Sequence, residues 1–555
     1  MGSKWQIHAC DVCRLLDNDR TLKECYYCGK CDAWICRSDQ FRLDRRIRAM
    51  KSRSGQKAVT AMKAIVVMIL LSLLSWGQTG TVGHAGVEIP VNFFGQHIQQ
   101  QSTPWPAIGF GAYRMWSNSS PSIARWAQIN TKAGTYDFTV IDSFLSEMQA
   151  HGIKTVVYTF GEVPKWASSN PTDTGCDFAA NGVFAQGGCD LPLDIAADGT
   201  GTNKMWIDFV TALAKHVNDA TYLKIHAHIR YWEPWNEWWR NNVVNNSSSS
   251  YPAVSVRATY AQMVRMAEDL RCIVTGTGSV NGAKCTKTAI DPTALITTPS
   301  DGGDDAGNPG SVMVFQNYLY CNGTGTRAPI SGSKCTTGSR GSAVSDVMNT
   351  HFYELQPERL SVDFQQYKSV MSKMDQAKPF WSGEGGWGSD TRKDISDPDI
   401  AASWISRYYL MGWAAGFSAM YWYAYDGNGT GVLWNSTTGL NKAGIAYGQT
   451  FEWMAGSSMN FLCNGPAYPA LGVYMCGFVQ RDGTQTLAVW DTSKTCVSGT
   501  CTTGPYTHDP KFITSEDVAG NVLPLKGSTV QVGIKPIMLF NVPGTVVLQG
   551  KIGLH

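Results

Sequence analysis

From about residue 88 onward, short apolar runs alternate with longer stretches in which apolar positions recur every three to four residues. Residues 138–151 illustrate the longer kind, because four apolar side chains fall on one helical face and Gly152 follows as a stop signal. Residues 154–161 illustrate the shorter kind, a β-branched and aromatic run bounded by turn residues. The same reasoning predicts strands at residues 91–98, 108–116, 154–161, 223–230, 294–298, 344–353, 379–384 and 417–425, and helices at residues 138–151, 204–217, 254–270, 364–374 and 400–415.

Eight strands that alternate with helices predict an α/β fold with a parallel sheet. Spread over about 350 residues, they favour a closed (β/α)8 or TIM barrel with loop insertions, the longer ones at residues 167–203 and 300–343. We expect the Gly/Ser/Asn-rich second insertion to be a loop. An open doubly wound sheet is the alternative, although no Gly-x-Gly-x-x-Gly follows the first strand, which disfavours a dinucleotide site.

The periodicity changes after residue 455. Residues 472–479 and 485–490 are short or alternating apolar runs separated by a hairpin-type turn at residues 481–484, and residues 530–532 and 537–540 are similar. This pattern predicts a small C-terminal β-sandwich domain of about 100 residues.

The N-terminal part differs in composition from the rest. Its first 63 residues hold 14 Lys and Arg against 7 Asp and Glu, whereas the remainder has a formal charge of −5. The apolar run at residues 64–76 follows Lys63. At 13 residues it is too short to span a membrane, but it fits the core of a signal peptide with a cleavage site at residues 83–85. We therefore expect a secreted or periplasmic protein without a stable membrane span.

These observations divide the chain into four parts. An export signal that begins at residue 62 also suggests that translation starts at Met50 or Met62 and that the preceding residues are an artefact of the gene model. The parts are a Cys-rich basic segment at residues 1–61, a signal peptide at 62–85, the barrel at 86–455 and the β-sandwich at 456–555.

Cysteine usage follows the same division. Six of the 16 cysteines lie in the first 36 residues, where Cys10, Cys13, Cys28 and Cys31 have the Cys-x2-Cys spacing of a zinc ribbon. We interpret the basic run that follows as solvated rather than as a nucleic-acid site. The ten cysteines beyond residue 170 lie in neighbouring pairs, which indicates disulfides in an oxidising compartment. The expected pairs are Cys176/Cys189, Cys272/Cys285, Cys321/Cys335, Cys463/Cys476 and Cys496/Cys501.

Polar side chains gather where the predicted strands end, which is where a barrel of this kind places its functional groups. Glu237 follows the fourth strand among four tryptophans, and Glu384 ends the seventh. Alone, the Trp-rich stretch is equally compatible with an aromatic core. The full set of strand-end candidates is His97, Arg114, Asn236, Glu237, His351, Tyr353, Glu384 and Trp422.

The two carboxylic acids suit the cleavage of a glycosidic bond. A retaining glycosidase needs two carboxyl groups about 5–5.5 Å apart, one protonated and one ionised. Arg114 close to Glu384 would keep that carboxylate ionised, so Glu237 would have the raised pKa and donate the proton.

These residues resemble the motifs of clan A glycoside hydrolases. The resemblance rests on the Asn-Glu pair after the fourth strand, His-x-Tyr on the sixth, Glu before Gly on the seventh and Trp on the eighth. Residues 93–98, 114–116 and 232–237 are most like the family 39 group, which includes β-xylosidases and α-L-iduronidases. Trp238 departs from this group, which usually has Pro at that position.

The resemblance implies a role for each residue. Glu237 would be the general acid/base and Glu384 the nucleophile, with Tyr353 holding the nucleophile. Asn236 would bind the sugar 2-hydroxyl, and His351 would tune the acid/base.

The resemblance also places Trp422 at the floor of the −1 subsite and adds His97 and Arg114 to the substrate-binding set. His97 is equally compatible with a buried structural histidine, and Arg114 with a barrel ion pair.

The sequence therefore predicts a secreted retaining glycoside hydrolase that acts on oligo- or polysaccharides. A transglycosidase on the same scaffold is one alternative. A non-catalytic carbohydrate-binding protein is another, although it would be expected to have lost a carboxylate. We expect a carbohydrate partner, no nucleic-acid partner for the barrel, no cofactor and no metal at the catalytic residues.

Overall fold

The computed structural model describes residues 25–28, 33–36, 84–116, 122–173, 186–238, 256–302, 309–321, 339–387, 395–427 and 431–542. The chain divides into two compact units, Met1–Gly80 and Thr81–His555. In the first unit, β1 (Cys25–Cys28) pairs antiparallel with β2 (Ala33–Cys36). The apolar run of the predicted signal peptide and three of the four predicted zinc ligands, Cys10, Cys13 and Cys31, lie outside the described residues.

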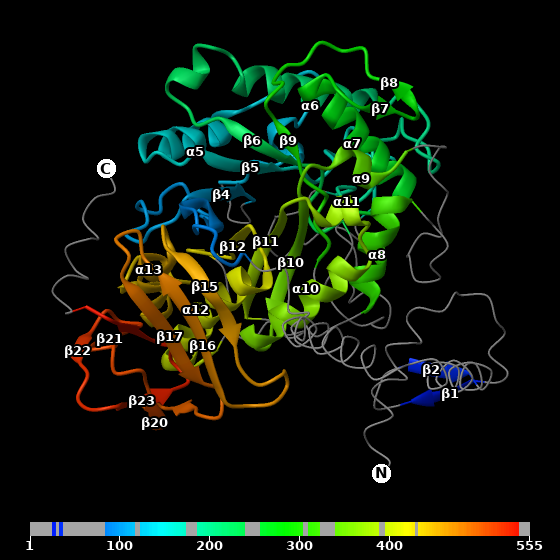
Figure 1. Ribbon diagram of the computed structural model, residues 1–555. Coiled ribbons are helices and arrows are strands. Elements are labelled where there is room, and N and C mark those ends of the chain that lie inside the picture. Colours follow the sequence, from blue (N-terminus) through cyan, green and yellow to red (C-terminus); the bar gives the residue numbers. More distant parts are fainter. Residues whose placement is uncertain are drawn as a thin grey trace. The chain divides into compact units, whose positions relative to one another are not determined.

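The second unit is built around an eight-stranded parallel sheet (Figure 1). Its order is β10-β11-β12-β3-β4-β5-β6-β9, and a parallel bridge between Thr297 and Val347 joins the last strand to the first. The sheet therefore closes, which confirms the (β/α)8 prediction over the open alternative. The strands are β3 (Phe94–Gln96), β4 (Ala112–Met115), β5 (Thr155–Thr159), β6 (Ile229–Glu233), β9 (Leu295–Ile296), β10 (Met348–Glu354), β11 (Phe380–Trp387) and β12 (Ala419–Trp422).

Helices between these strands pack apolar side chains into the core. α6 (Lys204–Val217) has the predicted bounds and buries Trp206, Phe209 and Leu213. The other helices around the barrel are α4 (Trp126–Ile129), α5 (Thr139–Ala150), α7 (Tyr260–Thr275), α8 (Pro309–Tyr320), α9 (Gly341–Val344), α10 (Leu360–Ser369), α11 (Lys373–Gln376), α12 (Pro398–Ala415) and α13 (Lys442–Met454).

The predicted fourth strand at residues 223–230 is wrong in its position. Asp219 Oδ1 accepts hydrogen bonds from the backbone N–H groups of Thr221 (2.8 Å) and Tyr222 (3.1 Å), which stabilises the 3-10 turn η3 (Tyr222–Lys224) where the strand was expected. β6 begins only at Ile229 and extends to Glu233. The Trp-rich stretch therefore belongs partly to the strand itself.

Local capping and packing account for other differences. The predicted loop at residues 300–343 contains α8, which buries Val314, Phe315 and Leu319. α7 begins at Tyr260 rather than residue 254, because Thr259 and Gln262 form a capping box there. The helix predicted at 364–374 is divided into α10 and α11, and the 3-10 turns η2 (Val91–Phe93) and η5 (Pro357–Arg359) precede β3 and α10.

The C-terminal part is an antiparallel sheet of order β15-β16-β17-β24-β21-β22. β20 and β23 pair separately and pack over one of its faces, where Val489, Val532 and Leu539 form a small core. The other face shares the core of the barrel through side chains such as Met459 and Phe478. The strands are β15 (Ser458–Asn464), β16 (Val473–Val479), β17 (Gln485–Asp491), β20 (Thr503–Thr507), β21 (Thr514–Asp517), β22 (Val522–Pro524), β23 (Thr529–Gly533) and β24 (Ile537–Phe540).

Three predicted disulfides are confirmed. They join Cys272 to Cys285, Cys463 to Cys476 and Cys496 to Cys501. Cys189 and Cys321 are also disulfide-bonded, while their expected partners Cys176 and Cys335 lie outside the described residues. Among the described residues, no helix has both the length and the apolar character needed to cross a membrane.

Candidate active site

A buried arginine connects three strands at the C-terminal end of the barrel. Arg114 of β4 donates from Nε to Glu233 Oε2 (2.7 Å) and from Nη2 to Glu233 Oε1 (2.9 Å). Its Nη1 donates to Glu384 Oε1 (2.8 Å), and Nη2 also donates to Asn236 Oδ1 (2.7 Å). The guanidinium therefore fixes the carboxylates of β6 and β11 and the amide that follows β6 relative to one another.

Glu384 is held as an anion. Besides the Arg114 contact, Tyr353 of β10 donates its hydroxyl to Glu384 Oε2 (2.8 Å). Burial by itself raises the pKa of this carboxyl. The electrostatic interactions with His351 and Arg114 and the hydrogen bonds from Tyr353 and Arg114 outweigh burial, so the pKa is below its ordinary value of 4.5. Glu384 is therefore ionised at neutral pH.

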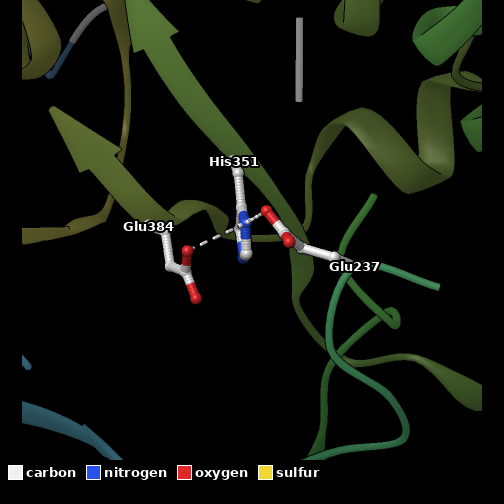
Figure 2. A group of neighbouring side chains, drawn as sticks. All are labelled: Glu237, His351 and Glu384. Carbon is white, nitrogen blue, oxygen red and sulfur yellow. Dashed lines mark hydrogen bonds and ion pairs between the residues drawn. The ribbon is translucent and has the colours of Figure 1, made fainter. Parts of the chain in front are cut away.

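His351 lies between the two candidate glutamates (Figure 2). Its Nδ1 is 3.0 Å from Glu237 Oε1 and 3.4 Å from Glu384 Oε2. Burial and the nearby charge of Arg114 lower the pKa of His351 to about 3, so the imidazole is neutral in the working range. Arg114 is the permanent positive charge beside Glu384.

Glu237 approaches His351 from the loop after β6. Its backbone has a φ of 42°, in the left-handed region that residues other than glycine seldom adopt. The Glu237 N–H donates to Ser300 Oγ (3.0 Å), and the Asn236 N–H donates to the carbonyl oxygen of Phe160 (3.0 Å). This turn directs the Glu237 carboxyl toward the imidazole.

The spacing of these groups suits two kinds of chemistry. One ligand atom each from Glu237, His351 and Glu384 lies within 4.8 Å of the others. Two carboxyl groups this close can act on opposite sides of one glycosidic bond with retention. The same three atoms could coordinate a divalent cation, since carboxylate and imidazole are ordinary metal ligands. The asymmetry between Glu384, which Arg114 holds ionised, and Glu237, which it does not contact in the described hydrogen bonds, is what acid–nucleophile chemistry requires.

Two predicted residues lie outside this hydrogen-bonded cluster. The Nε2 atom of His97 is 3.0 Å from the carbonyl oxygen of Gly383, and burial and Arg114 lower the His97 pKa well below its ordinary value. Trp422 is fully buried, donates to the carbonyl oxygen of Gly431 (2.7 Å) and meets Trp387 edge-on. Both side chains are buried, as Glu237 and Glu384 are, and their substrate-binding roles stay predictions.

Glu233 and Ser300 are the residues that sequence reasoning did not place among the site candidates. Glu233 accepts from Arg114 and also from Thr159 Oγ1 (2.9 Å) and the Ser300 N–H (3.2 Å). Its position in the strand that carries Asn236 and Glu237 was the available signal. Ser300 follows β9 in a stretch without a recognisable motif, so only the structure identifies it.

Aromatic side chains lie beside the cluster. Trp116, Tyr423 and Ala424 pack together with Tyr353, which holds Glu384. The guanidinium of Arg125 lies 3.8 Å from the centre of the Trp116 ring and pairs with Glu162.

Trp238, which replaces the proline usual in the family 39 motif, is a core residue. It is buried and meets Tyr260 of α7 edge-on, with ring centres 5.4 Å apart. The departure from the motif therefore adds a packing contact to the turn that carries Glu237.

Comparison with known proteins supports the fold. No protein-family model and no curated protein sequence matches the chain. A family 39 glycoside hydrolase from the gut symbiont Bacteroides cellulosilyticus WH2 superposes with a TM-score of 0.52 at 14% identity, over 81% of this chain and 80% of that one. In fold, the chain is similar to this glycoside hydrolase.

Two further structures match with lower scores. A glucosidase from Croceicoccus marinus has a TM-score of 0.48 at 10% identity, over 83% of this chain and 97% of that one. The catalytic domain of a family 30 xylanase C from Talaromyces cellulolyticus has a TM-score of 0.45 at 13% identity, with the same coverage of both chains.

Proposed function

We propose that this protein is a secreted retaining glycoside hydrolase that cleaves O-glycosidic bonds of oligo- or polysaccharides. Glu384 is the nucleophile and Glu237 the general acid/base. The observation that carries the proposal is the convergence of both carboxyls on one neutral imidazole, with Arg114 and Tyr353 donating to Glu384 and, in the described contacts, not to Glu237.

The reaction proceeds by two displacements. Glu384 attacks the anomeric carbon while Glu237 gives its proton to the glycosidic oxygen, so the C–O bond breaks, the leaving sugar departs as an alcohol and a glycosyl ester forms on Glu384. Glu237, now a carboxylate, then removes a proton from water, whose oxygen attacks the anomeric carbon and releases Glu384. Two inversions give a product with the configuration of the substrate.

The surrounding residues serve these steps. Asn236, fixed by Arg114, presents its amide to the sugar 2-hydroxyl, where a hydrogen bond strengthens in the transition state. His351 remains neutral and provides an uncharged partner for Glu237 in both of its protonation states. The disulfides of the second unit support the export part of the proposal, because such bonds persist in oxidising compartments.

The test is hydrolysis of aryl β-glycosides of xylose, glucose and their disaccharides by the wild type and two variants. We expect Glu384→Ala to lose turnover, and added azide to restore release of the aryl group with a product of inverted configuration. Glu237→Ala should lose about 10²–10⁴-fold in turnover, and azide should restore it with retained configuration.

Glu147→Ala is the matched control, because Glu147 lies on the exposed side of α5 and its substitution should leave activity unchanged. Wild-type activity in Glu384→Ala would refute the nucleophile assignment. Loss of wild-type activity on treatment with EDTA, restored by a divalent cation, would instead favour metal chemistry at Glu237, His351 and Glu384.

A further inference from the structure

The backbone conformation of Glu237 requires support from its surroundings. A φ of 42° at a non-glycine residue is a strained conformation that persists only where neighbouring contacts fix it. A backbone rotation at Glu237 would carry its carboxyl away from the imidazole of His351, whose Nδ1 lies 3.0 Å from Glu237 Oε1.

Ser300 makes four hydrogen bonds around this turn. Its Oγ accepts from the Glu237 N–H (3.0 Å), and its carbonyl oxygen accepts from the Trp238 N–H (3.1 Å). Its own N–H lies 3.2 Å from both the Trp235 carbonyl oxygen and Glu233 Oε1. Ser300 is fully buried. Its hydrogen bonds reach residues before, at and after Glu237.

Ser300 is itself fixed to the strand that carries His351. Thr298, two residues earlier, donates its hydroxyl to the Asn349 carbonyl oxygen (2.8 Å) and accepts from the Asn349 N–H (2.7 Å). Asn349 and His351 both belong to β10. β10 therefore carries His351, the partner of the Glu237 carboxyl, and also holds the Glu237 backbone through Thr298 and Ser300.

We propose that Ser300 is a positioning residue for the acid/base Glu237, acting through its hydroxyl on the left-handed turn. This inference rests on the proposed glycosidase function. The effect of Ser300 is limited to the step in which Glu237 donates its proton. The described contacts of Glu384 are to Arg114, Tyr353 and His351 and do not include Ser300.

Leaving groups of different acidity separate an effect on the acid Glu237 from an effect on the nucleophile Glu384. A phenyl or 4-methoxyphenyl leaving group needs a proton from Glu237, whereas 2,4-dinitrophenolate leaves without one. The ratio kcat/KM reports the first displacement only, so it isolates this requirement from the later attack of water.

The experiment measures kcat/KM of wild type, Ser300→Ala and Tyr353→Phe on both kinds of aryl β-glycoside. We expect Ser300→Ala to lose about tenfold or more on phenyl glycosides and to stay within about twofold of wild type on dinitrophenyl glycosides. Tyr353→Phe, which affects the nucleophile, should lose activity on both. Equal losses of Ser300→Ala on both substrates, or no loss on either, would overturn the proposal.

A shape-matched pair keeps the test valid if Ser300→Ala folds poorly. Ser300→Thr keeps the hydroxyl, and Ser300→Val has the shape of Thr without the hydroxyl. The Thr variant should show a leaving-group dependence close to that of wild type, and the Val variant should show that of Ser300→Ala. Ser403→Ala is the control, since Ser403 is buried in α12 and its Oγ has no hydrogen-bond partner among the described residues. It should change nothing.

The two proposals fail in different ways. If the wild type cleaves no aryl glycoside or oligosaccharide, the proposed function fails. If the wild type is active and the Thr and Val variants are indistinguishable on phenyl glycosides, the positioning role of Ser300 fails while the glycosidase assignment stands.

Discussion

At the scale of single residues, the contacts of the Arg114 guanidinium distinguish the surroundings of Glu384 from those of Glu237. Arg114 donates to Glu233 and Glu384, and the resulting buried network leaves Glu384 with a pKa below 4.5. His351 contacts both glutamates but is neutral, so it orients without adding charge. The proposed assignment of Glu384 as nucleophile therefore rests on its contact with the guanidinium.

This division predicts a pH effect for Tyr353→Phe. The acidic limb of the wild-type kcat/KM profile should lie below pH 4.5, because activity is lost as Glu384 is protonated. Removing the Tyr353 hydroxyl, which stabilises the carboxylate, raises the Glu384 pKa and should move this limb to higher pH. A pH–rate profile checks this, and an unmoved acidic limb would show that Tyr353 does not act on Glu384.

The sequence was sufficient to find six residues of the cluster, since strand ends and a family resemblance point to Arg114, Asn236, Glu237, His351, Tyr353 and Glu384. It was not sufficient for Ser300. Its role depends on a left-handed turn at Glu237 and on a contact between β6 and β9, neither of which leaves a local pattern. Trp422 lies on β12, the eighth strand, as predicted, and its edge-on contact with Trp387 depends on packing that no periodicity describes.

At the scale of elements, local turn and capping contacts determine where the elements begin. α6 was predicted with its observed bounds, because its apolar face is regular. β6 was displaced, because the Asp219 turn competes with the alternating pattern before it. α7 was displaced because its capping box determines where it begins.

The capping box predicts a local loss of stability. In Thr259→Ala, the hydrogen bond that the Gln262 N–H donates to Thr259 Oγ1 (3.1 Å) is lost, as is the one from Thr259 Oγ1 to the Ala197 carbonyl oxygen (2.6 Å). We expect the free energy of unfolding to fall by about 0.5–2 kcal/mol, with kcat/KM unchanged. Chemical denaturation measures this, and Thr259→Ser should recover most of the loss.

At the scale of the whole molecule, the barrel and the C-terminal sheet of the second unit share one core. Glu358 of η5 accepts from Arg407 of α12 (2.9 Å) and from the indole N–H of Trp490 in β17 (2.8 Å). All three side chains are buried, so a charged barrel residue depends on the sheet for one of its hydrogen bonds.

This interface predicts cooperative unfolding. Trp490→Phe leaves Glu358 without the indole donor and should lower the free energy of unfolding by about 1–3 kcal/mol. Because the two parts share a core, both wild type and variant should unfold in one transition by circular dichroism and by tryptophan fluorescence. Two separate transitions would show that the sheet is an independent domain.

The central claim is that Glu384 forms a covalent bond to the sugar. A 2-deoxy-2-fluoro aryl glycoside of the preferred sugar, with dinitrophenolate as leaving group, reacts readily to form the glycosyl ester. That ester is then hydrolysed only slowly, so it accumulates. Mass spectrometry of the inactivated wild-type protein should show one added fluoroglycosyl group on the peptide that contains Glu384, and Glu384→Ala should remain unlabelled. A label on another residue, or an active enzyme that forms no adduct and releases product of inverted configuration, would contradict the account.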